Sequence, residues 1–210
     1  MRSVEQYRDA ISSILEETQR LNHTIDSLLL LARAEAGNSS STSENIALAP
    51  LVVEVANMLS VLAEDNEIFL IQEEQGSPTV YGDRSLLRVA LINVVHNAIK
   101  FSPRGGTVQI TVTIDQKVAS VAVADQGPGL REDEFDAVFE RFYRGRINSP
   151  NDGNGLGLPI VKLIVERFGG TVNFDRTARS GASVVLRLPA TFRGDLPGFT
   201  SGHVLALIWG

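Results

Sequence analysis

The sequence predicts an α+β fold, a two-layer α/β sandwich preceded by one long coiled-coil-type helix. Three observations lead to this prediction. Residues 3–36 hold no glycine or proline and repeat apolar side chains at heptad spacing. After residue 44, amphipathic helices are interspersed with strands rich in β-branched residues. Between these two parts, residues 38–43 form a short polar linker.

The N-terminal helix is expected over residues 1–37 and ends at Gly37, a typical C-cap residue. Its apolar seam steps by three and four residues along Val4, Tyr7, Ile11, Ile14, Thr18, Leu21, Ile25, Leu28 and Ala32. No other stretch of the chain carries a matching long heptad. The seam therefore needs a partner helix from another chain or from a segment outside this sequence, and self-association of the chain is expected.

The sandwich itself is expected over residues 44–189, with residues 190–210 as a disordered tail. Helices are expected over Pro50–Ala63, from an N-cap at Asp83 to Lys100, briefly over Glu132–Phe139, and over Leu158–Phe168. Strands are expected over Ile68–Gln72, Thr107–Ile114, Val118–Ala124, Val172–Phe174 and Ala182–Leu188. A doubly wound dinucleotide fold is excluded, because no Gly-x-Gly-x-x-Gly follows a first strand.

Composition narrows the classes of function. The chain has 210 residues, a net charge of −6 and no cysteine. An acidic chain without a basic run is a poor polynucleotide binder, since neutralising phosphates needs lysine and arginine patches. The absence of cysteine excludes disulfides and thiolate metal sites. No apolar run approaches the roughly 18 residues of a membrane span, so the chain as given is expected to be soluble.

The first motif with recognisable chemistry is Asn93-Val-Val-His-Asn97-Ala-Ile-Lys100. Asn93 and Asn97 are four residues apart, so on a helix their side chains stack on one face, with Lys100 a turn further on. Two amide oxygens can ligate Mg²⁺ without adding charge beside a triphosphate, and an ammonium group can neutralise phosphate. The alternative is an ordinary helix C-terminal turn, where asparagine and lysine are common.

The second motif is Asp125-Gln-Gly127-Pro-Gly129, which directly follows an expected strand. A carboxylate at a strand end can accept a hydrogen bond from an exocyclic amine such as that of adenine, and glycines let a base approach the backbone. An ordinary strand-exit turn uses the same residue types.

The third motif is Gly153-Asn-Gly155-Leu156-Gly157-Leu158, which opens into an expected helix. Backbone N–H groups and the positive end of the helix dipole can bind phosphate there. A flexible loop before a helix is the alternative, although three alternating glycines fit it less well.

In this order and spacing, the motifs resemble the boxes of sensor histidine kinases. Asn93–Pro103 resembles the asparagine box and Asp125–Gly129 the first glycine box. Phe139–Arg144 resembles the phenylalanine box and Gly153–Leu158 the second glycine box. The resemblance implies a Bergerat-type (GHKL) ATP-binding fold, with Mg²⁺–ATP under a mobile lid between the last two boxes.

The resemblance also implies roles for individual residues. Asp125 would bind adenine, Asn97 would hold Mg²⁺, and Asn93 would assist at the metal and phosphate. Lys100 and Arg144 would contact phosphates and, with Asn93, form the catalytic set. Backbone and pocket contacts to the nucleotide would come from Gly127, Gly129, Gly153, Gly155, Leu156, Gly157 and Leu158.

One residue, Asn93, separates a kinase from the related ATPases. ATPases of the gyrase, Hsp90 and MutL type place a glutamate general base where this chain has Asn93, and an amide cannot take a proton from water. Asn93 therefore favours a kinase. The rivals that stay open are an ATPase or anti-sigma-type serine kinase of the same fold, and a fragment that binds ATP or dimerises without turnover.

The phosphoacceptor of the family is not found in the chain. None of His23, His96 and His203 is followed by an acidic residue and Thr-Pro. Residues 1–37 resemble only the second helix of the family's dimerisation hairpin. The expected function is transfer of the ATP γ-phosphate to a histidine supplied elsewhere, for relay to a response regulator. The implied setting is cytoplasmic, within a bacterial parent anchored in the membrane.

Overall fold

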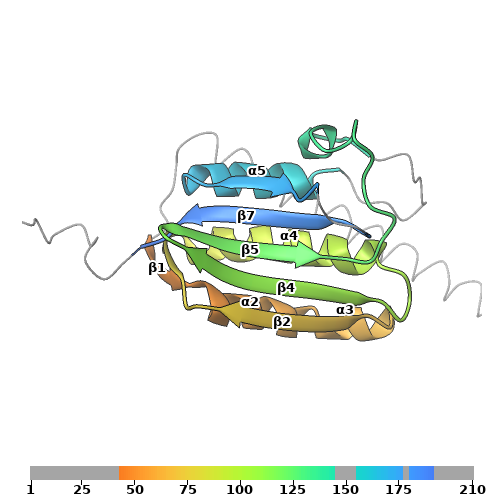
Figure 1. Ribbon diagram of the computed structural model, residues 1–210, viewed down its shortest axis with the longest axis horizontal. Helices are drawn as coiled ribbons and strands as arrows, with labels where there is room; N and C mark the ends of the chain where they lie inside the picture. The colour runs from red at the N-terminus through yellow and green to blue at the C-terminus, as the bar shows by residue number, and fades with distance from the viewer. Residues whose placement is uncertain (1–42, 145–154, 177–179, 192–210) are drawn as a thin grey trace, which may run out of the picture.

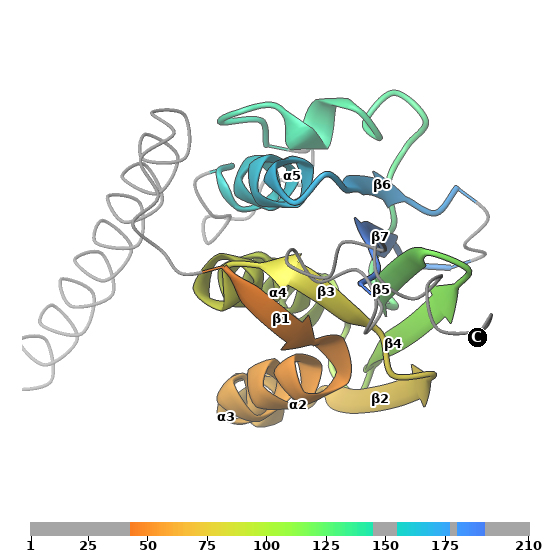
Figure 2. The same cartoon turned by 90° about the vertical axis from the view of Figure 1, so that its left-hand side faces the viewer.

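The computed structural model describes residues 43–144, 155–176 and 180–191. Within them, a five-stranded mixed sheet is covered on one face by helices, and a separate two-stranded sheet lies beside the helical layer (Figures 1 and 2). The predicted two-layer α/β sandwich is therefore confirmed. The predicted heptad helix of residues 1–37 and most of the 190–210 tail lie outside the described residues.

The large sheet has the strand order β2-β4-β5-β7-β6. β2 pairs with β4 in parallel, and the other neighbours pair antiparallel. The strands are β2 (Phe69–Gln75), β4 (Thr107–Asp115), β5 (Val118–Ala124), β6 (Thr171–Phe174) and β7 (Ser183–Pro189). Alternate residues of the central strands are buried, which is the period expected where one face of a sheet packs on helices.

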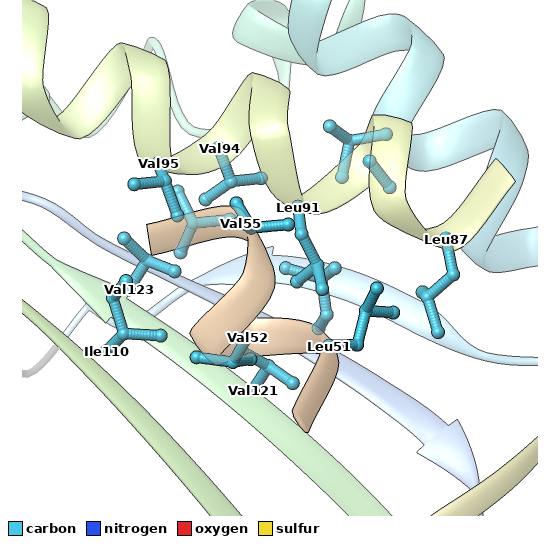
Figure 3. Close-up of a cluster of buried hydrophobic side chains, with 14 of the residues drawn as sticks. Leu51, Val52, Val55, Leu87, Leu91, Val94, Val95, Ile110, Val121 and Val123 are labelled. Atoms are coloured by element: carbon cyan, nitrogen blue, oxygen red, sulfur yellow. The ribbon is translucent and has the colours of Figure 1, made fainter. Parts of the chain in front are cut away.

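The helical layer consists of α2 (Leu48–Met58), α3 (Ser60–Asp65), α4 (Arg84–Phe101) and α5 (Gly157–Arg167). Seen edge-on, α4 lies between α5 and the α2–α3 pair, against the sheet (Figure 2). Figure 3 shows α2 and α4 meeting the sheet through aliphatic side chains. The labelled residues are Leu51, Val52, Val55, Leu87, Leu91, Val94, Val95, Ile110, Val121 and Val123.

Helix α4 begins where the sequence predicts. The Asp83 side chain accepts hydrogen bonds from the backbone N–H groups of Ser85 at 2.8 Å and Leu86 at 3.2 Å. This cap satisfies two of the donors that a helix start leaves without an intrahelical partner. Near the same end, Arg84 and Arg88 both pair with Glu54 of α2, and these pairs lower the pKa of the Glu54 carboxyl.

Several predicted elements differ in the structure. The single helix expected over Pro50–Ala63 is two helices, because the backbone leaves helical geometry at Leu59, whose φ and ψ are −100° and 3°. The short helix expected over Glu132–Phe139 is a series of turns ending in one 3₁₀ turn, Ala137–Phe139. The strand expected to end at Gln72 continues to Gln75 along β4.

The small sheet was not expected from the sequence. Strand β1 (Glu44–Ala47) pairs antiparallel with β3 (Thr79–Gly82), and each strand buries one apolar side chain, Ile46 or Val80. The chain continues past β7 in contact with this sheet, since the Thr191 N–H donates to the Thr79 carbonyl at 2.7 Å. Among the described residues, no helix is long and apolar enough to cross a membrane.

Candidate nucleotide-binding site

Asn93 and Asn97 lie one turn apart on α4, and the start of α5 packs against them. A Cβ added at Gly157, the first residue of α5, would lie 3.0 Å from Asn93 Oδ1 and 3.7 Å from Asn97 Nδ2. Asn93 Nδ2 donates to the Val89 carbonyl at 2.9 Å, which orients its side chain on the helix. The asparagine motif and the last glycine motif, predicted separately, are therefore in contact through a glycine.

The start of α5 leaves backbone donors without a side-chain cap. Leu156 is the N-cap residue, its side chain accepts no capping hydrogen bond, and it is buried. Pro159 lies in the first turn, where a missing N–H has no intrahelical partner to lose. Donors at a helix N-terminus, next to two amide side chains, suit the oxygens of a phosphate or of a metal–phosphate pair. Leu158, the second residue of α5, is half-buried.

Asp125 directly follows β5 and is held by backbone groups from two segments. Its Oδ1 accepts from the N–H of Gly127 at 2.8 Å and of Ala182 at 3.0 Å. Burial raises the pKa of the Asp125 carboxyl, while these two hydrogen bonds favour the ionised form. Because both bonds end on Oδ1, the carboxylate is oriented with Oδ2 as the oxygen that can accept from a ligand.

Glycines allow three backbone segments to meet around Asp125. A Cβ at Gly181 would lie 1.9 Å from the Asp125 carbonyl oxygen, and one at Gly127 would lie 2.6 Å from the Phe101 carbonyl oxygen. At Gly129, whose φ is +74°, a Cβ would lie 2.8 Å from the Gly181 carbonyl oxygen. The first glycine motif therefore packs between the end of α4 and the segment before β7.

Sequence reasoning missed the contribution of residues 181–183. Gly181 and Ala182 contact Asp125 from 56 and 57 positions along the chain. Ser183, paired with Ala124 in the β5–β7 register, is one of the few buried polar residues of the described part. The signal available in the sequence was a glycine standing two residues before the last strand.

The phenylalanine motif reaches the last glycine motif through the backbone. The Phe142 N–H donates to the Gly155 carbonyl at 2.9 Å, and a Cβ at Gly155 would lie 2.5 Å from the Tyr143 carbonyl oxygen. Phe139 packs its ring against Phe174 of β6, with centroids 5.7 Å apart. The two ends of the segment that carries residues 145–154 are thus joined.

Lys100 and Arg144 are the predicted phosphate contacts. Lys100 lies in the last turn of α4, with Nζ 5.1 Å from the centroid of the Phe101 ring. Arg144 is exposed at the end of the phenylalanine motif. Gly153 and the predicted lid lie outside the described residues.

A pocket of about 460 Å³ adjoins this arrangement at Gly129 and Gly181. Its lining comes from residues 128–135, 174–176 and 180–183, and includes the aromatic residues Phe135 and Phe174. Asn93, Asn97 and Asp125 do not line it.

The chain is similar in sequence and fold to known proteins. Residues 82–191 match the family described as histidine kinase-, DNA gyrase B- and HSP90-like ATPases. The chain is 34% identical over 192 residues to the sensor protein IrlS of Burkholderia pseudomallei, covering 90% of this chain and 41% of that protein. It is 34% identical over 181 residues to the sensor protein kinase PmrB of Pseudomonas aeruginosa, covering 85% and 37%.

The fold is also similar to that of solved structures. A mycobacterial sensor histidine kinase MprB superposes with a TM-score of 0.63 at 32% identity, covering 71% of this chain and 98% of that one. Full-length ShkA, in complex with AMPPNP, superposes with a TM-score of 0.75 at 28% identity, covering 91% and 40%.

The chain belongs to the histidine kinase-, DNA gyrase B- and HSP90-like ATPase family. Within that family it carries the ATP-binding catalytic domain of a sensor histidine kinase, as the motifs predicted. It spans 41% and 37% of the lengths of IrlS and PmrB.

Proposed function

We propose that the site binds Mg²⁺–ATP with its base at Asp125 and its phosphates between α4 and the start of α5. The contact of Gly157 with Asn93 and Asn97 is the observation that carries this proposal. It brings two neutral oxygen ligands together with uncapped helix donors, a combination that suits a metal–triphosphate. Complementary support comes from Asp125, whose orientation leaves one carboxylate oxygen for the amine of adenine.

The remaining roles follow from chemistry and position. Asn97, assisted by Asn93, would hold Mg²⁺, which when bound neutralises charge on the phosphates. Lys100 and Arg144 would contact phosphate oxygens. Backbone close to the nucleotide would come from Gly127 and Gly129 at the base, and from Gly153, Gly155, Leu156, Gly157 and Leu158 at the phosphates.

The reaction proposed is phosphoryl transfer to histidine. An imidazole nitrogen of the acceptor attacks the γ-phosphorus, a P–N bond forms, and the bond to the β–γ bridging oxygen breaks to leave ADP. Asn93 supports transfer over hydrolysis, because its amide cannot deprotonate an attacking water. In this respect the site differs from an ATPase that has glutamate at the same place.

The acceptor histidine is proposed to come from another segment or chain, and a response regulator to receive the phosphate from it. The heptad of residues 1–37 would join two copies of the chain. The double variant Ile14→Lys and Leu21→Lys, which places two charges in the seam, should then shift the chain towards monomer in light scattering. We place the chain on the cytoplasmic side of a membrane-anchored bacterial parent, in line with the naming of its relatives as sensor proteins.

The test of this function is transfer of label. The chain is mixed with γ-labelled ATP, Mg²⁺ and a partner that carries a complete phosphoacceptor hairpin whose own ATP site has been inactivated. Acid-labile label on the partner histidine is the expected result. Release of free phosphate without labelled protein would indicate an ATPase, and acid-stable label would indicate a serine kinase. ATP binding without either product would support a binding-only fragment.

A further inference from the structure

Glu134 stands out because it is the only charged side chain buried in the described part of the protein, at 8% exposure. It is not part of the proposed contacts with ATP. Burying a carboxylate is costly unless hydrogen bonds replace its water, so its partners indicate what it holds.

Those partners lie at the two ends of one segment. Glu134 Oε2 accepts from the Arg131 N–H at 3.1 Å, two residues after Gly129 of the first glycine motif. Glu134 Oε1 accepts from the Tyr143 hydroxyl at 3.4 Å, at the end of the phenylalanine motif. The Glu134 carboxylate thus connects the residues that follow the first glycine motif with the end of the phenylalanine motif.

The backbone beside Tyr143 is strained, and a contact that fixes Tyr143 helps to hold it. Phe142 has a φ of +64°, in the left-handed region that a bulky side chain rarely adopts. Phe142 is 62% exposed, so burial of its side chain does not hold this conformation. Strained backbone persists only where its surroundings determine it. The surroundings here include the Phe142–Gly155 hydrogen bond, a hydrogen bond from the Tyr143 N–H to the Glu140 carbonyl at 3.3 Å, and the Glu134–Tyr143 contact.

We propose that Glu134 is a positioning residue for the nucleotide site and acts through Tyr143. It holds the Phe142–Gly155 junction, and this junction leads within two residues to Gly157, against Asn93 and Asn97. The inference rests on the proposed function, because it concerns the geometry of the same ATP site.

The test compares four variants of the full chain, titrated with Mg²⁺–ATP in a calorimeter. Tyr143→Phe removes only the hydroxyl, and Glu134→Leu removes both acceptors. Glu134→Gln keeps both contacts, since its oxygen can accept from Arg131 and its amide can donate to the Tyr143 oxygen. Asp136→Asn, an exposed carboxylate two residues away, is the matched control. The unfolding midpoint of each unliganded variant is measured in parallel.

Tyr143→Phe should weaken ATP binding by about two- to ten-fold, the effect of losing one hydrogen bond, with an unchanged unfolding midpoint. Glu134→Leu should weaken it at least as much, while Glu134→Gln and Asp136→Asn bind as the unmodified chain does.

Wild-type affinity in both Tyr143→Phe and Glu134→Leu would overturn the positioning role, as would a Glu134→Gln variant as weak as Glu134→Leu. A Tyr143→Phe variant whose affinity falls only together with its unfolding midpoint would also overturn it. If the unmodified chain itself fails to bind ATP, the proposed function is wrong and this inference falls with it.

Discussion

At the scale of single residues, the Asp125 carboxylate is both the proposed ligand of adenine and a buried charge that lowers the stability of the fold. Burial raises the pKa of its carboxyl, so the native state holds the proton more tightly than the unfolded chain does. For such a group, the contribution to stability is largest at low pH. It declines as pH rises from about 4, the ordinary pKa of aspartate, through the higher native pKa.

Replacing Asp125 with Asn should remove this decline. The amide oxygen of asparagine can still accept from Gly127 and Ala182, and no charge has to be buried. The free energy of unfolding of the unliganded Asp125→Asn variant, measured with urea between pH 4 and pH 8, should therefore rise relative to the unmodified chain as pH rises. If the free energy of unfolding of the variant instead falls relative to that of the unmodified chain as pH rises, the ionised carboxylate stabilises the fold.

Gly181 offers a second test at this scale, with Gly105 as its matched control. Both have positive φ, +69° and +76°, but a Cβ at Gly181 would meet the Asp125 carbonyl whereas one at Gly105 would meet nothing within 4 Å. Gly105→Ala should cost about 1–2 kcal/mol from backbone strain alone. Gly181→Ala should cost about 1–3 kcal/mol more from overpacking.

Urea unfolding and ATP titration of both glycine variants check this expectation. Gly181→Ala should also weaken ATP binding, because it displaces the backbone that orients Asp125, while Gly105→Ala should not. Equal effects of the two substitutions would show that the close approach at Gly181 is unimportant.

At the scale of elements, the long helix α4 was predictable because its signals agree. Asp83 provides an N-cap, and the apolar residues that follow recur at helical spacing. The hairpin of β4 and β5 was equally predictable, because two segments with alternating apolar and polar residues flank a short turn.

Elements that depend on distant contacts were not predictable. β1 and β3 are four residues each with one buried side chain, too little for a periodic signal, and they pair across more than thirty positions. The break at Leu59 contains no glycine or proline to mark it. The turns over residues 132–136 stand where a short helix was expected, and Glu134 among them is buried.

The cap of α4 gives the prediction at this scale. Asp83→Ala should lower the free energy of unfolding by about 1 kcal/mol, since two backbone donors lose their acceptor. ATP affinity should be retained, because Asn93 lies more than two turns from the cap. Asp65→Ala, an exposed carboxylate on α3, serves as the control and should change stability by less than about 0.5 kcal/mol. A destabilisation no larger than that of the control would contradict the capping role.

At the scale of the whole molecule, local motifs predicted which residues carry the chemistry, and the fold shows how they meet. The asparagine, phenylalanine and glycine motifs could be recognised because their residue types and order are specific. Their contacts, Gly157 on Asn93 and Gly181 on Asp125, could not, because they arise from packing of α5 on α4 and of β7 beside β5. The segment before β7 carried no signal in the sequence beyond one glycine, Gly181.

The central claim is that this domain binds Mg²⁺–ATP with Asp125 accepting from the adenine amine. The most direct measurement is calorimetric titration of Mg²⁺–ATP into the unmodified chain and into Asp125→Asn. The variant should bind about ten- to a hundred-fold more weakly, because it loses a charge-assisted bond and turns an amide donor towards the amine. At pH 7 it should nevertheless unfold at an equal or higher urea concentration. Unchanged ATP affinity in a folded Asp125→Asn variant would contradict the account.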